Sequence, residues 1–189
     1  MPQPTEAMTP AAPRFRALLF TKTSGYRHAS IEKGTAVIGA LGAAHGFVVE
    51  ATEDASVFDD PQLAAYQVVI FLNTSGDILD APQQAAFERF VRAGGGFVGV
   101  HSATDTEYDW PWYHELVGAY FQNHPAIQPA AIDVVDRQHP STQHLPARWE
   151  RTDEWYNFRA APGQDVSVLA TLDESSYSGG TMGASHPIA

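Results

Sequence analysis

The segment GGGFVGVHSATDTEYDW, residues 94–110, runs from a glycine-rich turn through an apolar stretch to His101. An apolar strand that ends on this histidine, with the small residues Gly99, Ser102 and Ala103 beside it, resembles the strand-to-helix elbow that presents a nucleophile in several α/β enzymes. An imidazole can act as a general acid or base near pH 7, or bind a metal ion. His101 is therefore the main candidate for chemistry. Ser102, off the apex, is a weaker candidate nucleophile, and the alternative is a structural histidine hydrogen-bonded under a loop.

The other histidines show no local metal-binding spacing such as HExxH or HxH. Imidazole and carboxylate donors from distant parts of a chain can still meet in the fold, and they suit zinc or manganese. The candidate metal ligands are His101, His124 and His186, with further donors from His28, Asp105 and Glu154. In contrast, His45, His139 and His144 lie at a helix end or in turn-like contexts, which favours structural or surface roles.

The segment TDEWYNF, residues 152–158, places Glu154 beside two aromatic residues, Trp155 and Tyr156. Aromatic faces stack on the apolar faces of sugars, and carboxylates accept hydrogen bonds from sugar hydroxyls. Tyr108 and Trp110 lie in a second segment of this character. These patterns favour a carbohydrate pocket, with ordinary packing of the rings as the alternative.

The first half of the chain shows clear patterns for the strands and helices that must position these residues. Apolar runs over 15–23, 47–52, 67–74 and 96–101 alternate with helical segments from Ser30 to about His45 and over 81–95. This alternation predicts βαβ units and a mostly parallel sheet, and continuous apolar strands indicate helices on both faces. After about residue 110 no long helix is expected. We predict a tail over residues 1–13 and a single domain over 14–189, in which extra C-terminal strands extend the sheet.

Ligands of open α/β sheets bind beyond the carboxyl ends of the strands. Three loops leave such ends here: KTSGYRHAS, NTSGD and HSATDTEYDW. We therefore expect their polar side chains to share one rim, where they would contact substrate. These residues are His28, Asn73, Asp77, His101, Asp105 and Glu107.

Composition excludes several classes of function. The chain has no cysteine, so it can form no disulfide and use no thiolate nucleophile or zinc thiolate. Its net charge is −11, which argues against nucleic acid or an anionic membrane as a partner. The N-terminus has no apolar signal core and no apolar run approaches about 20 residues, so we expect a cytoplasmic protein.

Several segments together resemble the ThuA-like (trehalose-utilisation) family: SGYRHASI, VVIFLNTSGDIL, the long stretch FERFVRAGGGFVGVHSATDTEYDWPWYHELVGAYFQNHP, HPSTQHLPARWERTDEWYNF and TLDESSYSGGTMGASHPIA. The resemblance covers residues 15–189. It implies a flavodoxin-like α/β fold similar to class I glutamine amidotransferase domains. His101 takes the place of the catalytic cysteine of those domains, so a cysteine-dependent glutaminase is excluded. Family members normally continue past HPIA, and we expect the C-terminal segment of the family domain to be absent here.

The resemblance implies a role in carbohydrate metabolism, with a keto-sugar or glycoside as the substrate. We expect an enzyme in which His101, Glu154 and His124 are catalytic. The expected substrate-binding residues are Arg27, His28, Asn73, Asp77, Asp105, Glu107, Tyr108, Trp110, Trp155 and Tyr156. The alternatives are a non-catalytic carbohydrate-binding module and an interaction domain that forms a homo-oligomer through a sheet edge or the segment 108–121.

Overall fold

A computed structural model describes residues 13–189, so the tail expected over 1–13 lies, apart from Pro13, outside the described residues. The described chain forms two compact units. The first contains the residues up to Thr74 together with Ile78–His101, and the second contains Ser75–Asp77 and Ser102–Ala189. The single domain expected over 14–189 stays a prediction, and each unit is described by itself below.

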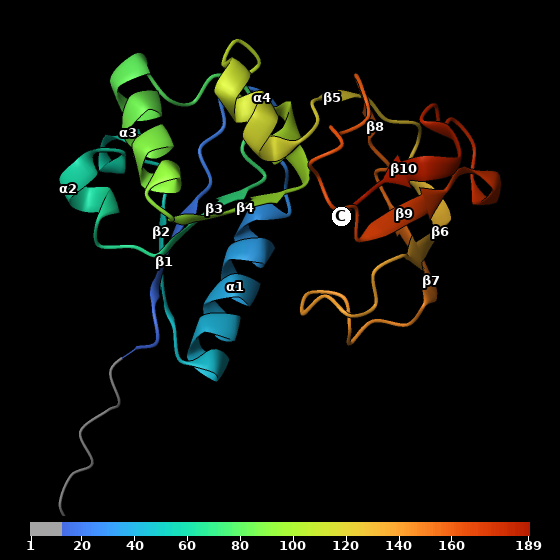
Figure 1. The fold of residues 1–189 in the computed structure, drawn as a ribbon, viewed down its shortest axis with the longest axis horizontal. Helices are drawn as coiled ribbons and strands as arrows, with labels where there is room; N and C mark the ends of the chain where they lie inside the picture. The colour runs from blue at the N-terminus through green and yellow to red at the C-terminus, as the bar shows by residue number, and fades with distance from the viewer. Residues whose placement is uncertain (1–12) are drawn as a thin grey trace, which may run out of the picture. The chain divides into compact units, whose positions relative to one another are not determined.

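The first unit contains a four-stranded parallel sheet (Figure 1). Its strands are β1 (Arg16–Phe20), β2 (Val48–Thr52), β3 (Val68–Leu72) and β4 (Gly96–Val100), in the order β2-β1-β3-β4. All three pairings are parallel, as predicted. The chain crosses from β1 to β2 on one side and returns to β3 on the other. Such a reversal creates the crevice in which α/β proteins bind ligands.

Local signals set the bounds of the helices in this unit, which are α1 (Ile31–His45), α2 (Asp60–Leu63) and α3 (Ala81–Arg92), with a 3₁₀ turn η1 (Ala55–Val57). Asp80 caps α3 through a capping box with Gln83, and Pro82 occupies its first turn. Gly46 ends α1 with a φ of 75°, a left-handed conformation that glycine adopts at little cost. The predicted starts of both long helices are confirmed.

The helices cover both faces of the sheet. Successive strand residues point to opposite faces, so Leu72 and Phe71 of β3 show which helix covers each face. On one face, α1 packs so closely on β3 that a Cβ added to Gly34 would lie 2.9 Å from a methyl group of Leu72. On the other face, the ring of Phe71 stacks on Phe87 of α3 at 5.3 Å. Figure 1 shows α1 on the opposite side of the sheet from α2 and α3. The predicted two-sided α/β layering is therefore confirmed.

The second unit is built mainly from antiparallel strands. Its elements are the 3₁₀ turn η2 (His101–Asp105, of which His101 belongs to the first unit), α4 (Pro111–Val117), β5 (Phe121–Asn123), β6 (Gln128–Val134), β7 (Arg148–Asp153), β8 (Asn157–Phe158), β9 (Ala170–Asp173), η3 (Glu174–Ser176), η4 (Gly183–Ser185) and β10 (His186–Pro187). One sheet has the order β10-β9-β6-β7, and β5 pairs with β8 in another.

The extra C-terminal strands were correctly expected, but the expectation that they extend the first sheet is wrong. They pair with one another in an antiparallel manner and bury a core of their own, which consists of Ala130, Ile132, Trp155, Ala170 and Leu172. No helix in the described part of the chain is long and apolar enough to cross a bilayer.

Candidate functional site

His101 occupies a sharp turn where β4 ends and η2 begins. Its φ is 53°, which lies in the left-handed region. Holding a non-glycine residue in this conformation costs about 1–3 kcal/mol. Ser102 and Ala103, which follow it, are fully buried, so the turn leaves no room for larger neighbours. The strand-to-helix elbow predicted from the sequence is therefore present in outline, with a 3₁₀ turn in place of a longer helix.

The ends of three strands coincide, and this brings their loops together. Phe20 of β1 pairs with Phe71 of β3, and Leu72 pairs with Val100 of β4. The backbone N–H of Asn73 continues this register by donating to the carbonyl of Val100. The loops after β1, β3 and β4 thus leave one edge of the sheet, as the sequence predicted.

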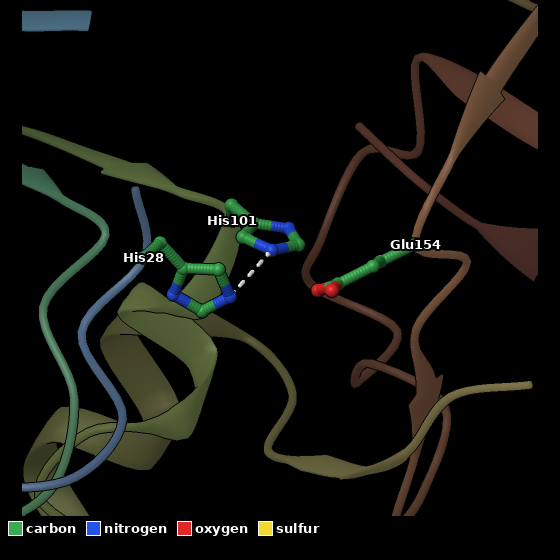
Figure 2. A group of neighbouring side chains, drawn as sticks. All are labelled: His28, His101 and Glu154. Atoms are coloured by element: carbon green, nitrogen blue, oxygen red, sulfur yellow. Dashed lines mark hydrogen bonds between the residues drawn. The ribbon is translucent and has the colours of Figure 1, made fainter. Parts of the chain in front are cut away.

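His28 and His101 meet at this edge. Their Nε2 atoms lie 3.2 Å apart, their ring centroids are 4.7 Å apart, and the ring planes cross at 78°. Figure 2 shows the two Nε2 atoms facing one another. Both side chains are partly buried. Since a hydrogen bond needs one donor and one acceptor, one ring presents Nε2–H and the other presents a lone pair.

Contacts that the sequence analysis did not predict hold the loop that carries His28. Asn73 is buried, has a φ of 51°, and donates from Nδ2 to Ser30 Oγ at 2.8 Å. Lys22 Nζ donates to the carbonyl of Ile78 at 2.8 Å. The ring of Tyr26 meets His28 edge-on at 4.8 Å. Asn73, predicted to contact substrate, thus positions the loop. The pattern SGYRHAS contained Tyr26 and Ser30 but no signal of these partners.

Arg27 points to surface carboxylates. It forms ion pairs with Glu53 at 2.9 Å and with Glu32 at 3.2 Å. Hydrogen bonds to Glu53, and then to Glu32, raise the pKa of this guanidinium above its usual value. The positive charge of Arg27, predicted to hold substrate, is compensated within the first unit.

The predicted acidic residues after β3 and β4 belong to the second unit, where backbone hydrogen bonds join their segments. Gly76 N–H donates to the carbonyl of Asp105 at 2.8 Å, and Glu107 N–H donates to the carbonyl of Gly76 at 3.1 Å. Asp77, next in the chain, is exposed. Glu107 is buried and has a φ of 56°. Asp105 accepts a hydrogen bond from the hydroxyl of Tyr108 at 2.5 Å.

The predicted aromatic residues are buried or partly buried. Trp155 is 2 % exposed and donates from its indole N–H to the carbonyl of Gln128, so it belongs to the core of the second unit and presents no ring face to a ligand. Trp110 is partly buried, and its ring lies 5.0 Å from that of Trp112 and stacks on Tyr113.

Tyr156 lies in a cluster of rings with Phe121 and His124, which we call the aromatic cluster. Its ring lies 4.2 Å from Phe121 and 5.9 Å from His124, and the planes of Tyr156 and His124 differ by 21°. His124 is exposed and Tyr156 is partly buried. Burial, and then the charge of Glu154, raise the pKa of Tyr156 well above its usual value.

His186, a predicted metal ligand, is buried in β10 and both its ring nitrogens face protein acceptors. Nδ1 lies 2.8 Å from Glu174 Oε1, and Nε2 lies 2.8 Å from the carbonyl of Tyr156. Burial would raise the pKa of Glu174, but hydrogen bonds from the N–H groups of Met182 and Gly183, and from His186, lower it. The metal set His101, His124 and His186 stays a prediction, and it would require His186 to give up the hydrogen bond at the nitrogen that binds the ion.

Glu154, also labelled in Figure 2, belongs to the second unit, between β7 and β8, and is partly buried. Its predicted catalytic role, like that of His124, stays a prediction. The first unit therefore brings together His28 and His101 from the predicted set, held by Asn73 and the loop after β1.

Comparison with known proteins identifies the family. The model of the family described as "ThuA: Trehalose utilisation" matches residues 16–189. A crystal structure of a ThuA-like protein from Bacteroides uniformis ATCC 8492 superposes with a TM-score of 0.81 and 32% sequence identity, over 98% of this chain and 80% of that one. A ThuA-like protein from Parabacteroides merdae ATCC 43184 has a similar fold, with a TM-score of 0.75 and 21% identity over 93% and 74% of the two chains. No curated protein matches. The chain therefore belongs to the ThuA family, with a class I glutamine amidotransferase-like fold and a role in carbohydrate metabolism.

Proposed function

We propose that this protein is an enzyme that acts on a sugar derivative, a keto-sugar or a glycoside, at the imidazole pair of His28 and His101. The observation that carries the proposal is the 3.2 Å approach of the two Nε2 atoms at the carboxyl edge of a parallel sheet. The left-handed backbone of His101 supports it, because strained residues cluster at functional sites. Membership of a trehalose-utilisation family supports a sugar as the substrate.

One imidazole carries a ring N–H and the other a lone pair, and because these groups bond to one another, a sugar oxygen would engage them by replacing that bond. Such a pair can hydrogen-bond the hydroxyl or carbonyl oxygen of a sugar and can move a proton at that oxygen or at the carbon beside it. The chain has no cysteine, so the proposed reaction uses no covalent thioester. Asp77, Asp105, Glu107, Glu154 and His124 are proposed to contact the sugar hydroxyls or assist the proton transfer, as expected from the sequence.

A second candidate is a carbohydrate-binding domain without turnover. The aromatic cluster favours it, since Tyr156 and His124 present nearly parallel rings on the second unit and His124 is exposed. Stacking of a sugar on these rings would need no reactive imidazole. In this case the pair of His28 and His101 would contribute little to binding.

One experiment separates the two candidates. Turnover of a panel of glycosides and 3-keto-sugars is followed by mass spectrometry, and binding of the same compounds by calorimetry. The wild type is compared with His28→Gln and His101→Asn, and His45→Gln, an exposed histidine of the same unit, is the matched control. An enzyme loses turnover by about 100-fold or more in both site variants but not in the control. Binding without turnover in every form would support the binding domain and refute the enzyme.

A further inference from the structure

We propose that His28 and His101 together bind one divalent transition-metal ion, zinc or manganese, through their Nε2 atoms. This inference rests on the site of the proposed function and names the group that would act there. Of the ligands expected from the sequence it keeps His101, takes His28, there a further donor, as the second imidazole, and leaves out His186, which is engaged elsewhere.

The distance between the two nitrogens is the first argument. Two nitrogens that bind one tetrahedral ion at about 2.0–2.1 Å lie about 3.3 Å apart. The Nε2 atoms of His28 and His101 are 3.2 Å apart, which matches the separation of two ligands of one ion, with the ion beside the line that joins the nitrogens. The ring planes cross at 78°, which keeps the rings from colliding when both nitrogens point to one ion.

The rigidity of the two supports is the second argument. Metal ligands act with high affinity when they are positioned before the ion arrives, and the residues that position them matter nearly as much as the ligands. His101 is the first residue after a strand, in a turn of fixed left-handed geometry. His28 lies in the loop that Asn73 holds through Ser30. The end of the parallel sheet thus positions both histidines.

Charge is the third argument. Arg27 is next to His28 in the chain, but its guanidinium is paired with two carboxylates, Glu53 and Glu32. The positive charge is therefore offset, and it does not oppose a cation at the imidazoles. Two protein nitrogens leave two positions on a tetrahedral ion, one for a carboxylate and one for a water molecule or a sugar oxygen, as in catalytic metal sites. Glu154, a further metal donor and a catalytic residue in the sequence-based expectation, is the proposed carboxylate.

The test uses the full chain without an affinity tag, stripped with a chelator. Elemental analysis after dialysis against zinc or manganese gives the stoichiometry, and titration with Co²⁺ gives the affinity and a d–d absorption spectrum that reports nitrogen ligands. The variants are His28→Gln, His101→Asn and Glu154→Gln, with His45→Gln as the control. Asparagine is chosen at position 101 because it tolerates left-handed backbone, so the fold is retained. Circular dichroism checks each variant.

We expect about one ion per chain in the wild type and the control, and a loss of affinity of about 100-fold or more in both His28→Gln and His101→Asn. A loss of metal affinity in Glu154→Gln would identify Glu154 as the carboxylate ligand. The inference is overturned if the folded wild type binds none of the three ions, or if either histidine variant binds them as tightly as the wild type. Turnover of a sugar by the metal-free protein would overturn the metal inference and leave the proposed function intact. Metal binding without turnover of any sugar would overturn the proposed function and leave the metal inference intact.

Discussion

The Nε2 atoms of His28 and His101 lie 3.2 Å apart although 73 positions separate the two residues in the chain. One follows β1 and the other follows β4, and β3 lies between these strands in the sheet. The contact therefore depends on loops that reach across β3, where Asn73 holds the first of them. Each prediction below concerns one of the features that create or surround this arrangement.

The backbone at position 101 should decide which substitutions are tolerated there. Asparagine adopts a φ of 53° readily, whereas a β-branched residue does so only with strain. His101→Val should be less stable to urea than His101→Asn by about 1–2 kcal/mol. Equal stabilities of the two variants would show that the turn relaxes and is not held in the left-handed region.

The hydroxyl of Ser30 should matter more than its exposed position suggests. Ser30→Ala removes the acceptor of the buried Asn73 amide and frees the loop that carries His28. We expect a loss of stability of about 1–2 kcal/mol and a loss of Co²⁺ affinity of about 10-fold. The control is Ser185→Ala, an exposed serine of the second unit. If Ser30→Ala matches this control in both measurements, the hydrogen bond does not position the loop.

His186 should be a structural residue. His186→Leu leaves the Glu174 carboxylate and the Tyr156 carbonyl without the ring that faces both. We expect the free energy of unfolding to fall by about 1–3 kcal/mol, the cost of leaving a buried hydrogen-bonding group without its partner. His144→Leu, at an exposed position, should change it by no more than about 0.5 kcal/mol. Urea denaturation followed by tryptophan fluorescence measures both, and an effect at position 186 as small as that at position 144 would contradict the structural role.

Asp173 should make the second unit sensitive to acid. Hydrogen bonds from the Ser175 hydroxyl, then from Arg148, and then from the Ser175 N–H lower the pKa of this carboxyl to about 2. An unfolded aspartate has a pKa of about 3.9, so the stabilisation is complete above pH 4 and is lost as the pH falls from about 4 to about 2.

Asp173→Asn should reduce the loss of stability between about pH 4 and about pH 2. Asp109→Asn, at an exposed site, should leave this loss as in the wild type. The measurement is the urea midpoint between pH 2 and pH 5. A variant profile that still falls as steeply as the wild type would assign the acid sensitivity to other carboxylates.

Several features of this protein follow from the sequence because their causes are local. The apolar runs predict parallel strands, and the cap at Asp80 and the glycine at position 46 predict where helices begin and end. The absence of cysteine excludes thiolate chemistry without any structure. The small residues after His101 predict a tight turn at a strand end.

The pairing of distant segments was decided only in the tertiary structure. Composition does not specify strand order, so the partnership of His28 with His101 and the support from Asn73 could not be derived. The same is true of the second unit, where antiparallel pairing places Trp155 in a core and sets His186 against Glu174. The physical reason is that these contacts draw their energy from long-range packing and hydrogen bonding, which local sequence patterns do not encode.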